Sequence, residues 1–388
     1  MTEELSQPAR ILVVDDVEVN RDLLSRRLKQ QGHEVAMAEN GKKALERIRA
    51  ENFDLVLLDI MMPEMDGYQV LGEMMADPAL KHLPVIMISA VTEMDSVVKC
   101  VEMGATDYLP KPFNPVLLKA RVSATLEKKR LRDRERLYAK SLERELEIGR
   151  EIQKSFLPEA LPQFPGWQIA ARFAPARQVA GDFYDAFALP APGQVGLVVS
   201  DVCDKGVGAA LFMALFRSLL RAAATADPCA SGAAAMLSGV VRRTNDYIAN
   251  THSRACMFAT LFFGALDTAS GELHYVNGGH EAPAVFSSAG IRARLSPTGP
   301  AVGMLADASF DVASTRLAPG EGLLAFTDGV TDARGPSGRY GEERLLGLLA
   351  TPPSSAGAVL DSVEASVREH VSGAEPADDI TMLAVFHD

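Results

Sequence analysis

The chain carries the stretch LVLLDIMMPEMDG at residues 55–67, in which four apolar residues lead into an aspartate and a turn-forming segment. A short continuous apolar run that stops at such a turn is typical of a buried strand in a parallel sheet. Open α/β sheets place their reactive groups at the carboxyl ends of the strands. We therefore expect Asp59 at a strand end, where its carboxylate can take part in chemistry.

Similar apolar runs lie on both sides of this stretch and alternate with amphipathic segments. The amphipathic residues 20–31 and 41–51 have the length and periodicity of helices. Strands that alternate with helices of this size predict a doubly wound, flavodoxin-like parallel α/β sheet. The other predicted strands are ILVVDD (11–16), PVIMIS (84–89), DYLPKP (107–112) and, with a weaker pattern, residues 34–38.

Charged and hydroxyl side chains follow the strands of this predicted sheet, namely Asp15, Asp16, Asp59, Ser89 and Lys111. The carboxyl ends of parallel strands share one edge, so we expect these groups to converge. Clustered carboxylates bind a hard cation such as Mg²⁺, and an aspartate can accept a phosphoryl group whose charge the cation and a lysine neutralise. Each residue alone could be a turn former or a solvated charge. Their order and spacing along the chain favour a functional site over these structural alternatives.

These motifs resemble those of the response-regulator receiver family: VVDD (13–16), LLDIMMPEMDG (57–67), the pair Ser89 and Ala90, and YLPKPF (108–113). The resemblance implies that Asp59 accepts phosphate from a sensor histidine kinase. It also implies a Mg²⁺ site made by Asp15, Asp16, Asp59 and the Met61 carbonyl, a switch pair of Ser89 and Tyr108, and a phosphoryl contact from Lys111. The family further leads us to expect a cis Lys111–Pro112 bond.

Residues 116–157 have no proline, dense mixed charge and sparse apolar residues, and they predict one long helix. The apolar residues recur three to seven positions apart at Leu126, Leu131, Tyr138, Leu142, Leu146, Ile152 and Phe156. Such a seam favours a parallel two-stranded coiled coil and hence a homodimer. The alternative is a single solvated helix that packs on a neighbouring domain. The predicted domains are a receiver at 8–118, this linker at 119–157 and a third domain at 158–388.

The third domain shows antiparallel, hairpin-like strands interrupted by helices, with the turn TASGE at 268–272. This pattern predicts an α+β fold, a β-sandwich flanked by helices. The predicted strands are residues 195–201, 259–267, 272–277, 322–328 and 380–386, and the predicted helices are 208–226, 233–249 and 355–371.

Carboxylates lie beside four of these segments, at Asp182 and Asp185, Asp201, Asp328 and Asp332, and Asp378 and Asp379. Oxygen ligands without histidine or cysteine favour Mg²⁺ or Mn²⁺ over zinc. Two such ions about 3.5–4 Å apart can activate water for attack on a phosphate ester. The alternative is that individual aspartates cap turns and helices, and that His280 is an ordinary loop histidine.

The order of the segments resembles the SpoIIE-type branch of metal-dependent serine/threonine phosphatases, relatives of protein phosphatase 2C. The motifs are REIQKSFLP (150–158), VAGDFYD (179–185), SDVCDKGVGAALFMA (200–214), NGGHEAP (277–283), TGPAVG (298–303), FTDGVTDA (326–333) and DDIT (378–381). The resemblance implies two Mn²⁺ or Mg²⁺ ions bound by Asp182, Asp201, the Val202 carbonyl, Asp328 and Asp378, with Asp379 as a neighbouring candidate. Cys203 and Asp204 depart from the Ser and Gly of many members.

Together the two resemblances imply a response regulator whose phosphatase output is gated by phosphorylation at Asp59. The family's usual substrate is a phosphorylated anti-sigma-factor antagonist, a small STAS-domain protein, in a partner-switching pathway. The alternative is a non-catalytic adaptor that binds a sigma factor or its antagonist when phosphorylated. The complete set of aspartates favours the enzyme.

The composition of the chain limits the kinds of partner that we expect the protein to bind. The net charge of −12 and pI near 5.2 argue against nucleic acid or an anionic membrane, and the basic run at 128–136 is interleaved with acids, as on a solvated helix face. The four cysteines form no C-x-x-C pair, which indicates reduced thiols. Residues 1–10 have no signal-peptide core, and Arg217 and Arg221 interrupt the apolar stretch 208–226. We therefore expect a cytoplasmic protein without a membrane span.

Overall fold

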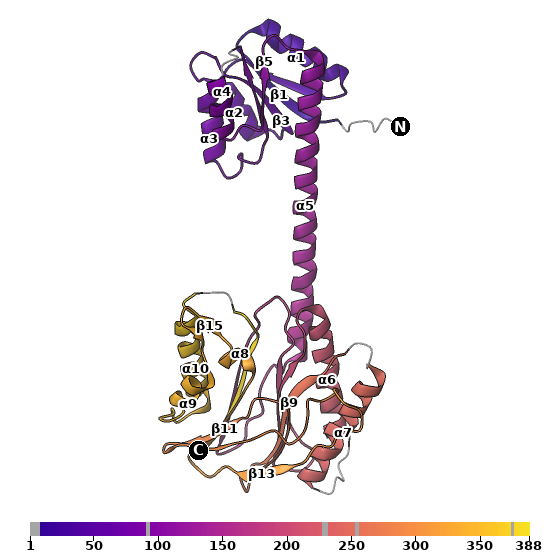
Figure 1. Cartoon of the computed structure of the whole chain (residues 1–388), viewed down its shortest axis with the longest axis vertical. Coiled ribbons are helices and arrows are strands. Elements are labelled where there is room, and N and C mark those ends of the chain that lie inside the picture. The colour runs from indigo at the N-terminus through magenta and orange to yellow at the C-terminus, as the bar shows by residue number, and fades with distance from the viewer. Residues whose placement is uncertain (1–7, 91–93, 227–231, 253–255, 374–375) are drawn as a thin grey trace. The chain divides into compact units, whose positions relative to one another are not determined.

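The computed structural model describes residues 8–388 except 91–93, 227–231, 253–255 and 374–375 (Figure 1). Cys229 and the first seven residues therefore lie outside the described residues. The chain divides into two compact units, an N-terminal unit at Met1–Leu142 and a C-terminal unit at Glu143–Asp388. Each unit has its own apolar core.

The N-terminal unit is a five-stranded parallel sheet in the order β2-β1-β3-β4-β5, which confirms the predicted doubly wound fold. The order reverses between β1 and β3, and this switch point is where such sheets place their ligands. The strands are β1 (Arg10–Val14), β2 (Glu34–Ala38), β3 (Leu55–Asp59), β4 (Val85–Ser89) and β5 (Asp107–Pro110); the helices are α1 (Glu18–Gln30), α2 (Gly41–Ala50), α3 (Gly67–Ala76) and α4 (Met94–Glu102).

The turn after β3 shows how the quoted stretch forms its local structure. Asp66 caps α3 by accepting a hydrogen bond from the backbone of Gln69, whose side chain in return accepts one from the backbone N–H of Asp66. Gly67 lies so close to β3 that a Cβ atom there would be 2.2 Å from the Asp59 carbonyl oxygen. A larger residue would therefore displace the strand end that carries Asp59.

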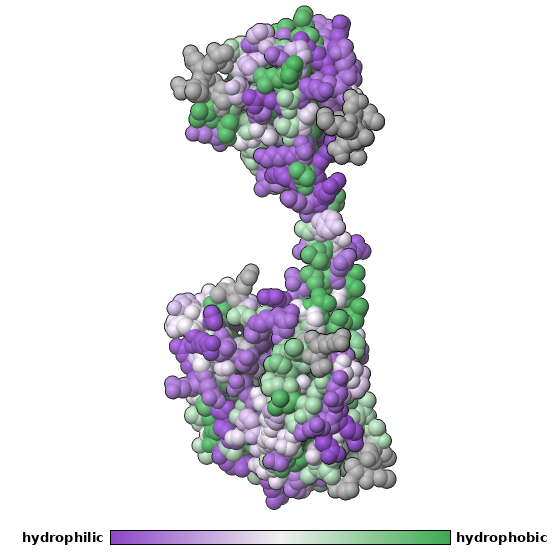
Figure 2. Space-filling model, turned by 45° about the vertical axis from the view of Figure 1, so that its right-hand side comes forward, coloured by the Kyte–Doolittle hydropathy of each residue, from purple (hydrophilic) through white to green (hydrophobic). Residues whose placement is uncertain are grey.

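A single helix, α5 (Pro115–Phe156), spans 42 residues and confirms the predicted long helix. Its first turns belong to the core of the N-terminal unit, where Leu118, Val122 and Leu126 are buried. Leu126 is therefore a core residue, not a member of an exposed seam as the sequence suggested. Farther along the helix, apolar side chains are exposed, as the surface view shows (Figure 2). They include Leu131, Leu137, Tyr138, Leu142, Ile148 and Ile152.

The C-terminal unit contains two antiparallel five-stranded sheets packed face to face, in the orders β13-β10-β9-β8-β7 and β12-β11-β14-β17-β6. Helices α6 and α7 cover the first sheet, and α9 and α10 cover the second. This arrangement confirms the predicted sandwich with outer helices. The strands are β6 (Trp167–Ala174), β7 (Phe183–Ala188), β8 (Gln194–Val202), β9 (Ala259–Asp267), β10 (Glu272–Gly278), β11 (Ala284–Ser287), β12 (Gly290–Arg294), β13 (Ala313–Arg316), β14 (Glu321–Phe326) and β17 (Ile380–His387).

The remaining elements of this unit are α6 (Val207–Thr225), α7 (Ala233–Thr251), α8 (Asp328–Thr331), α9 (Glu342–Leu348), α10 (Ala356–Val371) and a small ribbon of β15 (Arg334–Gly335) and β16 (Gly338–Arg339). The predicted strand at 322–328 ends at Phe326, and Asp328 instead begins the short helix α8. The turn between β9 and β10 joins a hairpin as predicted.

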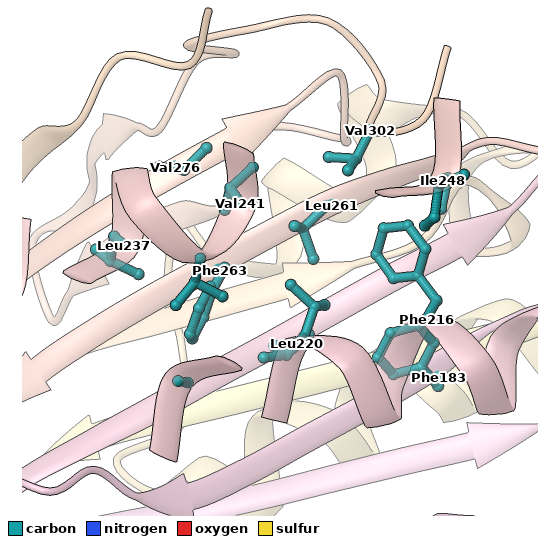
Figure 3. Close-up of a cluster of buried hydrophobic side chains, with 14 of the residues drawn as sticks. Phe183, Phe216, Leu220, Leu237, Val241, Ile248, Leu261, Phe263, Val276 and Val302 are labelled. Carbon is teal, nitrogen blue, oxygen red and sulfur yellow. The ribbon is translucent and has the colours of Figure 1, made fainter. Parts of the chain in front are cut away.

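Apolar packing against the first sheet fixes α6 and α7. Phe216 and Leu220 of α6 and Leu237 and Val241 of α7 lie over Phe263 of the sheet (Figure 3). Among the described helices, α6 alone is long and apolar enough to cross a bilayer, but core helices pass the same test. Its apolar face is packed in this cluster, as the prediction of a buried helix requires.

Candidate functional site

The acidic residues of the N-terminal unit meet at the switch point of its sheet. Asp15 and Asp16 follow β1, Asp59 ends the neighbouring β3, and one carboxylate oxygen from each lies within 4.8 Å of the others. Asp15 and Asp59 are buried, whereas Asp16 is exposed. Three hard oxygen donors at this spacing suit a divalent cation such as Mg²⁺.

Lys111 brings a positive charge into this cluster. Its Nζ lies 2.9 Å from Asp15 Oδ2 and 2.8 Å from Asp59 Oδ2. Burial alone would lower the pKa of Lys111, but the hydrogen bonds to Asp59 and Asp15 outweigh it and raise that pKa. Burial raises the pKa of Asp59, and Lys111 partly offsets the increase. The following peptide bond, Lys111–Pro112, is cis as expected.

The other predicted residues of this site lie around the cluster. Ser89 ends β4 and is buried, and Tyr108 lies half-buried on the adjacent β5. The Arg121 guanidinium stacks over the Tyr108 ring at 5.0 Å from its centroid. The Met61 side chain is exposed, so any part it plays belongs to its backbone.

Sequence reasoning missed two residues that hold the acidic loop. Asn20 Nδ2 donates to both carboxylate oxygens of Asp15 at 3.1 Å. Arg21 donates to the backbone carbonyls of Asp15 and Asp16 at 2.7 and 2.9 Å. Their position in the first turn of the helix after the acidic pair was the signal that could have identified them.

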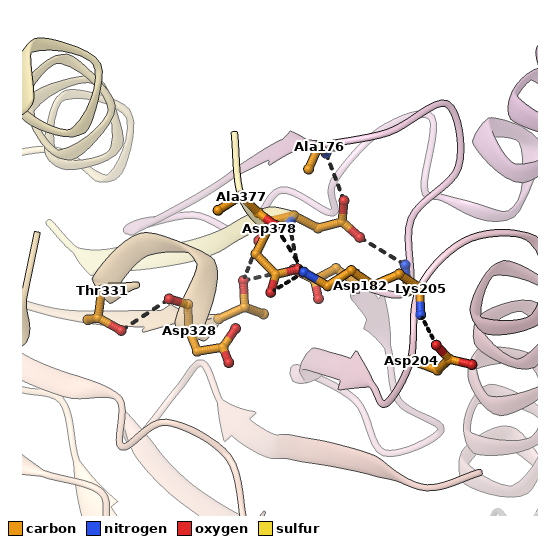
Figure 4. Close-up of polar contacts among 11 residues, drawn as sticks. Ala176, Asp182, Asp204, Lys205, Asp328, Thr331, Ala377 and Asp378 are labelled. Atoms are coloured by element: carbon orange, nitrogen blue, oxygen red, sulfur yellow. Dashed lines mark hydrogen bonds and ion pairs between the residues drawn. The ribbon is translucent and has the colours of Figure 1, made fainter. Parts of the chain in front are cut away.

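In the C-terminal unit, four segments bring carboxylates together, and Figure 4 shows three of them, Asp182, Asp328 and Asp378. Asp182 precedes β7, Asp201 lies in β8, Asp328 begins α8, and Asp378 precedes β17. Asp182 interacts electrostatically with Asp201, which in turn interacts with Asp328 and Asp378. The two sheets of the sandwich thus supply one acidic centre.

The acidic centre carries more negative charge than its surroundings neutralise. Burial, followed by repulsion from Asp201, raises the pKa of Asp182 well above its usual range. Burial raises the pKa of Asp201 to about 7. Burial and the neighbouring Asp378 raise the pKa of Asp328. Buried carboxylates with hard oxygen donors and raised pKa values fit a divalent cation, because the cation supplies the missing positive charge.

The ammonium group of Lys205 lies against this acidic centre. Its Nζ is 2.7 Å from Asp378 Oδ2 and donates to the Ala377 carbonyl at 2.9 Å. Within the described part of this unit, no three carboxylates place oxygens within 4.8 Å of one another, in contrast to the N-terminal cluster. The C-terminal carboxylates are therefore more widely spaced than the N-terminal ones.

Asp379 has a different environment from its neighbour Asp378. Its two carboxylate oxygens accept hydrogen bonds from the backbone N–H groups of Ala176 at 2.7 Å and Gly181 at 2.9 Å. Burial nevertheless raises the pKa of Asp379. Asp379 therefore fixes the loop that leads into Asp182.

Two threonines that the sequence analysis did not assign complete the inner part of the site. The Thr327 hydroxyl donates to Asp182 Oδ2 at 2.7 Å and accepts from the Thr381 backbone N–H at 3.0 Å. Thr327 directly follows β14, and Thr381 lies in the paired strand β17. Both threonines could have been identified from the sequence, because they lie inside the motifs FTDG and DDIT.

The segment after Asp201 accommodates its unusual residues. Asp204 has φ 73°, in the left-handed region that favours glycine, and its carboxylate accepts from the Lys205 backbone N–H at 2.8 Å. Aspartate tolerates this conformation better than most residues. The Val202 carbonyl lies close to Gly181, where a Cβ atom would be only 2.9 Å from it.

Three other candidates have structural partners. Asp185 is buried and paired with Arg217 at 2.9 Å and Arg221 at 3.1 Å. Asp332 pairs with Arg339 at 2.9 Å. His280 is buried, its Nδ1 lies 2.8 Å from the Thr260 hydroxyl, and burial lowers its pKa to about 4. These contacts are those of residues with a structural role, which was the alternative for individual aspartates and for His280.

Comparison with known proteins gives the same division of the chain. The family model "Stage II sporulation protein E (SpoIIE)" matches residues 191–388, just over half of the chain, and the model "Response regulator receiver domain" matches residues 11–123. The chain belongs to the SpoIIE family. It joins a SpoIIE domain to an N-terminal receiver domain.

Two relatives cover different parts of this SpoIIE-family chain. Protein IcfG of Synechocystis is 46% identical over 264 residues, which make up 63% of this chain and 42% of IcfG. Response regulator PleD of Caulobacter vibrioides is 43% identical over 114 residues, 29% of this chain and 25% of PleD. The chain thus spans less than half the length of either relative.

A solved structure supports the fold of the SpoIIE domain. The SiaA-PP2C domain of Pseudomonas aeruginosa matches 65% of this chain and 99% of its own length, with a TM-score of 0.54 and 20% identity. At that identity the likeness concerns the fold alone. The C-terminal sandwich therefore has the protein phosphatase 2C fold.

Proposed function

We propose that this protein is a response regulator whose output is a metal-dependent phosphoserine/phosphothreonine protein phosphatase. The observation that carries the proposal is the buried Asp182 beside the half-buried Asp201, joined by Asp328 and Asp378 from the other sheet. Such a concentration of carboxylates is costly unless cations bind to it. Membership of the SpoIIE family supports the same activity.

Each residue of the proposed phosphatase site has a part in this function. Asp182, Asp201, Asp328, Asp378 and the Val202 carbonyl would hold two Mn²⁺ or Mg²⁺ ions, with Asp379 positioning the loop beside them. Such ions supply an activated water and neutralise the charge of a phosphate ester. Thr327 orients the Asp182 carboxylate through its hydroxyl hydrogen bond. Lys205 places an ammonium group at the edge of the site, where it can attract a phosphorylated side chain.

The receiver domain would control this output through Asp59. A sensor histidine kinase would transfer a phosphoryl group from its phosphohistidine to an Asp59 oxygen, breaking the N–P bond and forming an acyl phosphate. Asp15 and Asp16 would hold Mg²⁺ together with Asp59 and the Met61 carbonyl, and Lys111 would bind a phosphoryl oxygen. Ser89 and Tyr108, which flank the cluster on β4 and β5, are the proposed switch residues.

The linker helix α5 is the proposed route between the domains and the proposed dimer contact. Leu131, Tyr138, Leu142 and Ile152 are exposed and follow the four-and-three spacing of a coiled-coil seam, although acidic residues and Gly149 interrupt it. Pairing with a second α5 would bury this seam. The homodimer stays a prediction.

The proposed substrate is the phosphoserine form of a small STAS-domain anti-sigma-factor antagonist, in keeping with the usual pathway of the SpoIIE family. A cytoplasmic location, with no nucleic-acid or membrane partner, stays a prediction from composition. The adaptor alternative shares the receiver but requires no turnover.

Turnover of a phosphoserine STAS protein by the full-length chain tests this proposal. We expect phosphate release that requires Mn²⁺ or Mg²⁺ and that Asp201→Asn abolishes. Absence of turnover by a folded, metal-supplied protein, in both the free and the phosphorylated receiver state, would refute the enzyme and favour the adaptor. A matched control is Asp361→Asn, which removes an exposed carboxylate outside the site.

A further inference from the structure

The last turns of α5 lie against the segment that leads into Asp182. Gly149 and Gln153 are four residues apart and therefore share one face of the helix. The helix passes close to Val179 at Gly149, where a Cβ atom would be in ordinary contact with the Val179 side chain at 3.7 Å. Gln153 reaches the next residue, Ala180. The helix thus lies against two consecutive residues of the segment and hydrogen bonds to the second.

Gln153 binds Ala180 through both ends of its amide. Its Nε2 donates to the Ala180 carbonyl at 2.6 Å, and the Ala180 N–H donates to Gln153 Oε1 at 3.0 Å. Gln153 is only 7% exposed and Ala180 is fully buried. The glutamine amide therefore pairs with Ala180 as a neighbouring strand would, in a place where water cannot substitute for it.

The segment that Gln153 holds passes directly into the acidic centre. Gly181 follows Ala180 and donates its N–H to Asp379 Oδ2, and it has no free space on the side of the Val202 carbonyl. Asp182 comes next and is bound by Thr327. A shift of Ala180 must therefore move Asp182 or break one of these contacts, because closely packed interiors do not deform smoothly.

We propose that Gln153 is a positioning residue through which the end of α5 sets the position of Asp182, and with it the affinity of the acidic centre for its divalent cation. The inference rests on the proposed function, since it assumes that Asp182 binds the metal. The two hydrogen bonds between Gln153 and Ala180 are the physical contact by which a change in α5 reaches the site. Glutamine is suited to this contact because it offers a donor and an acceptor together.

Substitutions at Gln153 separate this positioning role from a merely structural one. Gln153→Met keeps the length of the side chain but removes both hydrogen bonds, and Gln153→Glu keeps the acceptor for the Ala180 N–H but loses the donor. Lys154→Met is the matched control, because Lys154 is exposed on the same turn. All variants are made in the full-length chain.

Two measurements give the outcome. Calorimetric titration with Mn²⁺ should show at least tenfold weaker binding in Gln153→Met, a smaller loss in Gln153→Glu and no change in Lys154→Met. Hydrogen exchange should be faster in a peptide covering residues 179–183 of Gln153→Met. If Gln153→Met does not fold, Gln153→Glu decides by the same two measurements.

A Mn²⁺ affinity within twofold of wild type, in a variant whose peptide exchanges faster, would overturn the proposal, because Gln153 would then support the fold without positioning Asp182. If the wild-type protein shows no Mn²⁺ binding that is lost in Asp182→Asn, the proposed metal site is refuted, and the inference with it. The two failures are distinguished by the wild-type titration.

Discussion

The two acidic sites of this protein differ in how their charge is balanced. In the N-terminal unit, the Lys111 ammonium lies within 2.9 Å of both Asp15 and Asp59, so a positive charge is part of the folded site. In the C-terminal unit, the buried Asp182 lies beside the half-buried Asp201, and Lys205 pairs with Asp378 at the edge. In the first site, Lys111 already supplies a positive charge to two of the carboxylates. The second depends more strongly on added cations, and metal binding should therefore couple to its stability.

The largest effect that this comparison predicts is for Asp201→Asn. We expect phosphatase turnover to fall at least about 100-fold, because a metal-binding carboxylate is lost. Without metal, the free energy of unfolding should rise by roughly 1–2 kcal/mol, because a half-buried carboxylate that repels its neighbours becomes a neutral amide. Phosphate release with Mn²⁺ and urea unfolding with chelator measure the two effects. Destabilisation of the metal-free protein would contradict the imbalance of charge.

The pH dependence of the C-terminal unit offers a second test through His280. Burial lowers its folded pKa to about 4 from 6.5, so the unfolded state binds more protons between these pH values. Its contribution to stability is therefore lost as the pH falls from about 6.5 to 4, by about 2–3 kcal/mol in total. His280→Gln should flatten this part of the stability curve. The free energy of unfolding is measured by urea unfolding at several pH values. If its dependence on pH is the same in His280→Gln as in the wild type, His280 is not buried in its neutral form.

The two lysines provide a direct contrast between the sites. Lys111→Met removes an ammonium that two buried carboxylates share, and it should destabilise the N-terminal unit by about 1–3 kcal/mol in the absence of Mg²⁺. Lys205→Met removes a more exposed partner and should cost less than about 1 kcal/mol in the C-terminal unit. Urea unfolding, followed by a probe in each unit, compares them. Equal losses would remove the distinction drawn between the two sites.

The smallest expected effect is that of Asp204→Gly beside the C-terminal site, and Gly181→Ala in the adjoining segment provides the contrast. Asp204→Gly should stabilise the protein by about 0.5 kcal/mol, because glycine adopts φ 73° without strain. Gly181→Ala should destabilise it by about 1–2 kcal/mol, because the added Cβ would lie 2.9 Å from the Val202 carbonyl. Thermal unfolding measures both. If both variants were neutral, the tight fit of these two segments would be in doubt.

The N-terminal unit was largely predictable from the sequence because its strands are continuous apolar runs and its chemistry lies at their ends. All five strands, including the weaker one at 34–38, are present, and the parallel order brings Asp15, Asp16 and Asp59 together. Asn20 and Arg21 were missed because their partners are set by the turn of the helix, which residue type alone does not specify.

The C-terminal unit was less predictable because its contacts join distant segments. Strands β6, β7, β11, β12 and β13 were not predicted, since they are short or mix polar and apolar residues. Asp185 has the same local pattern as Asp182, but Arg217 and Arg221 of α6 bind it. Gln153 lies in a charged helix, and only the fold brings it to Ala180.

The most direct test of a receiver-gated phosphatase is the Mn²⁺-dependent turnover of a phosphoserine STAS protein by the full-length chain, measured with and without beryllofluoride as an acyl-phosphate mimic at Asp59. The account predicts turnover that shifts with beryllofluoride in the wild type, and no such shift in Asp59→Asn. Turnover that beryllofluoride leaves unchanged would keep the enzyme and contradict the coupling of the two domains.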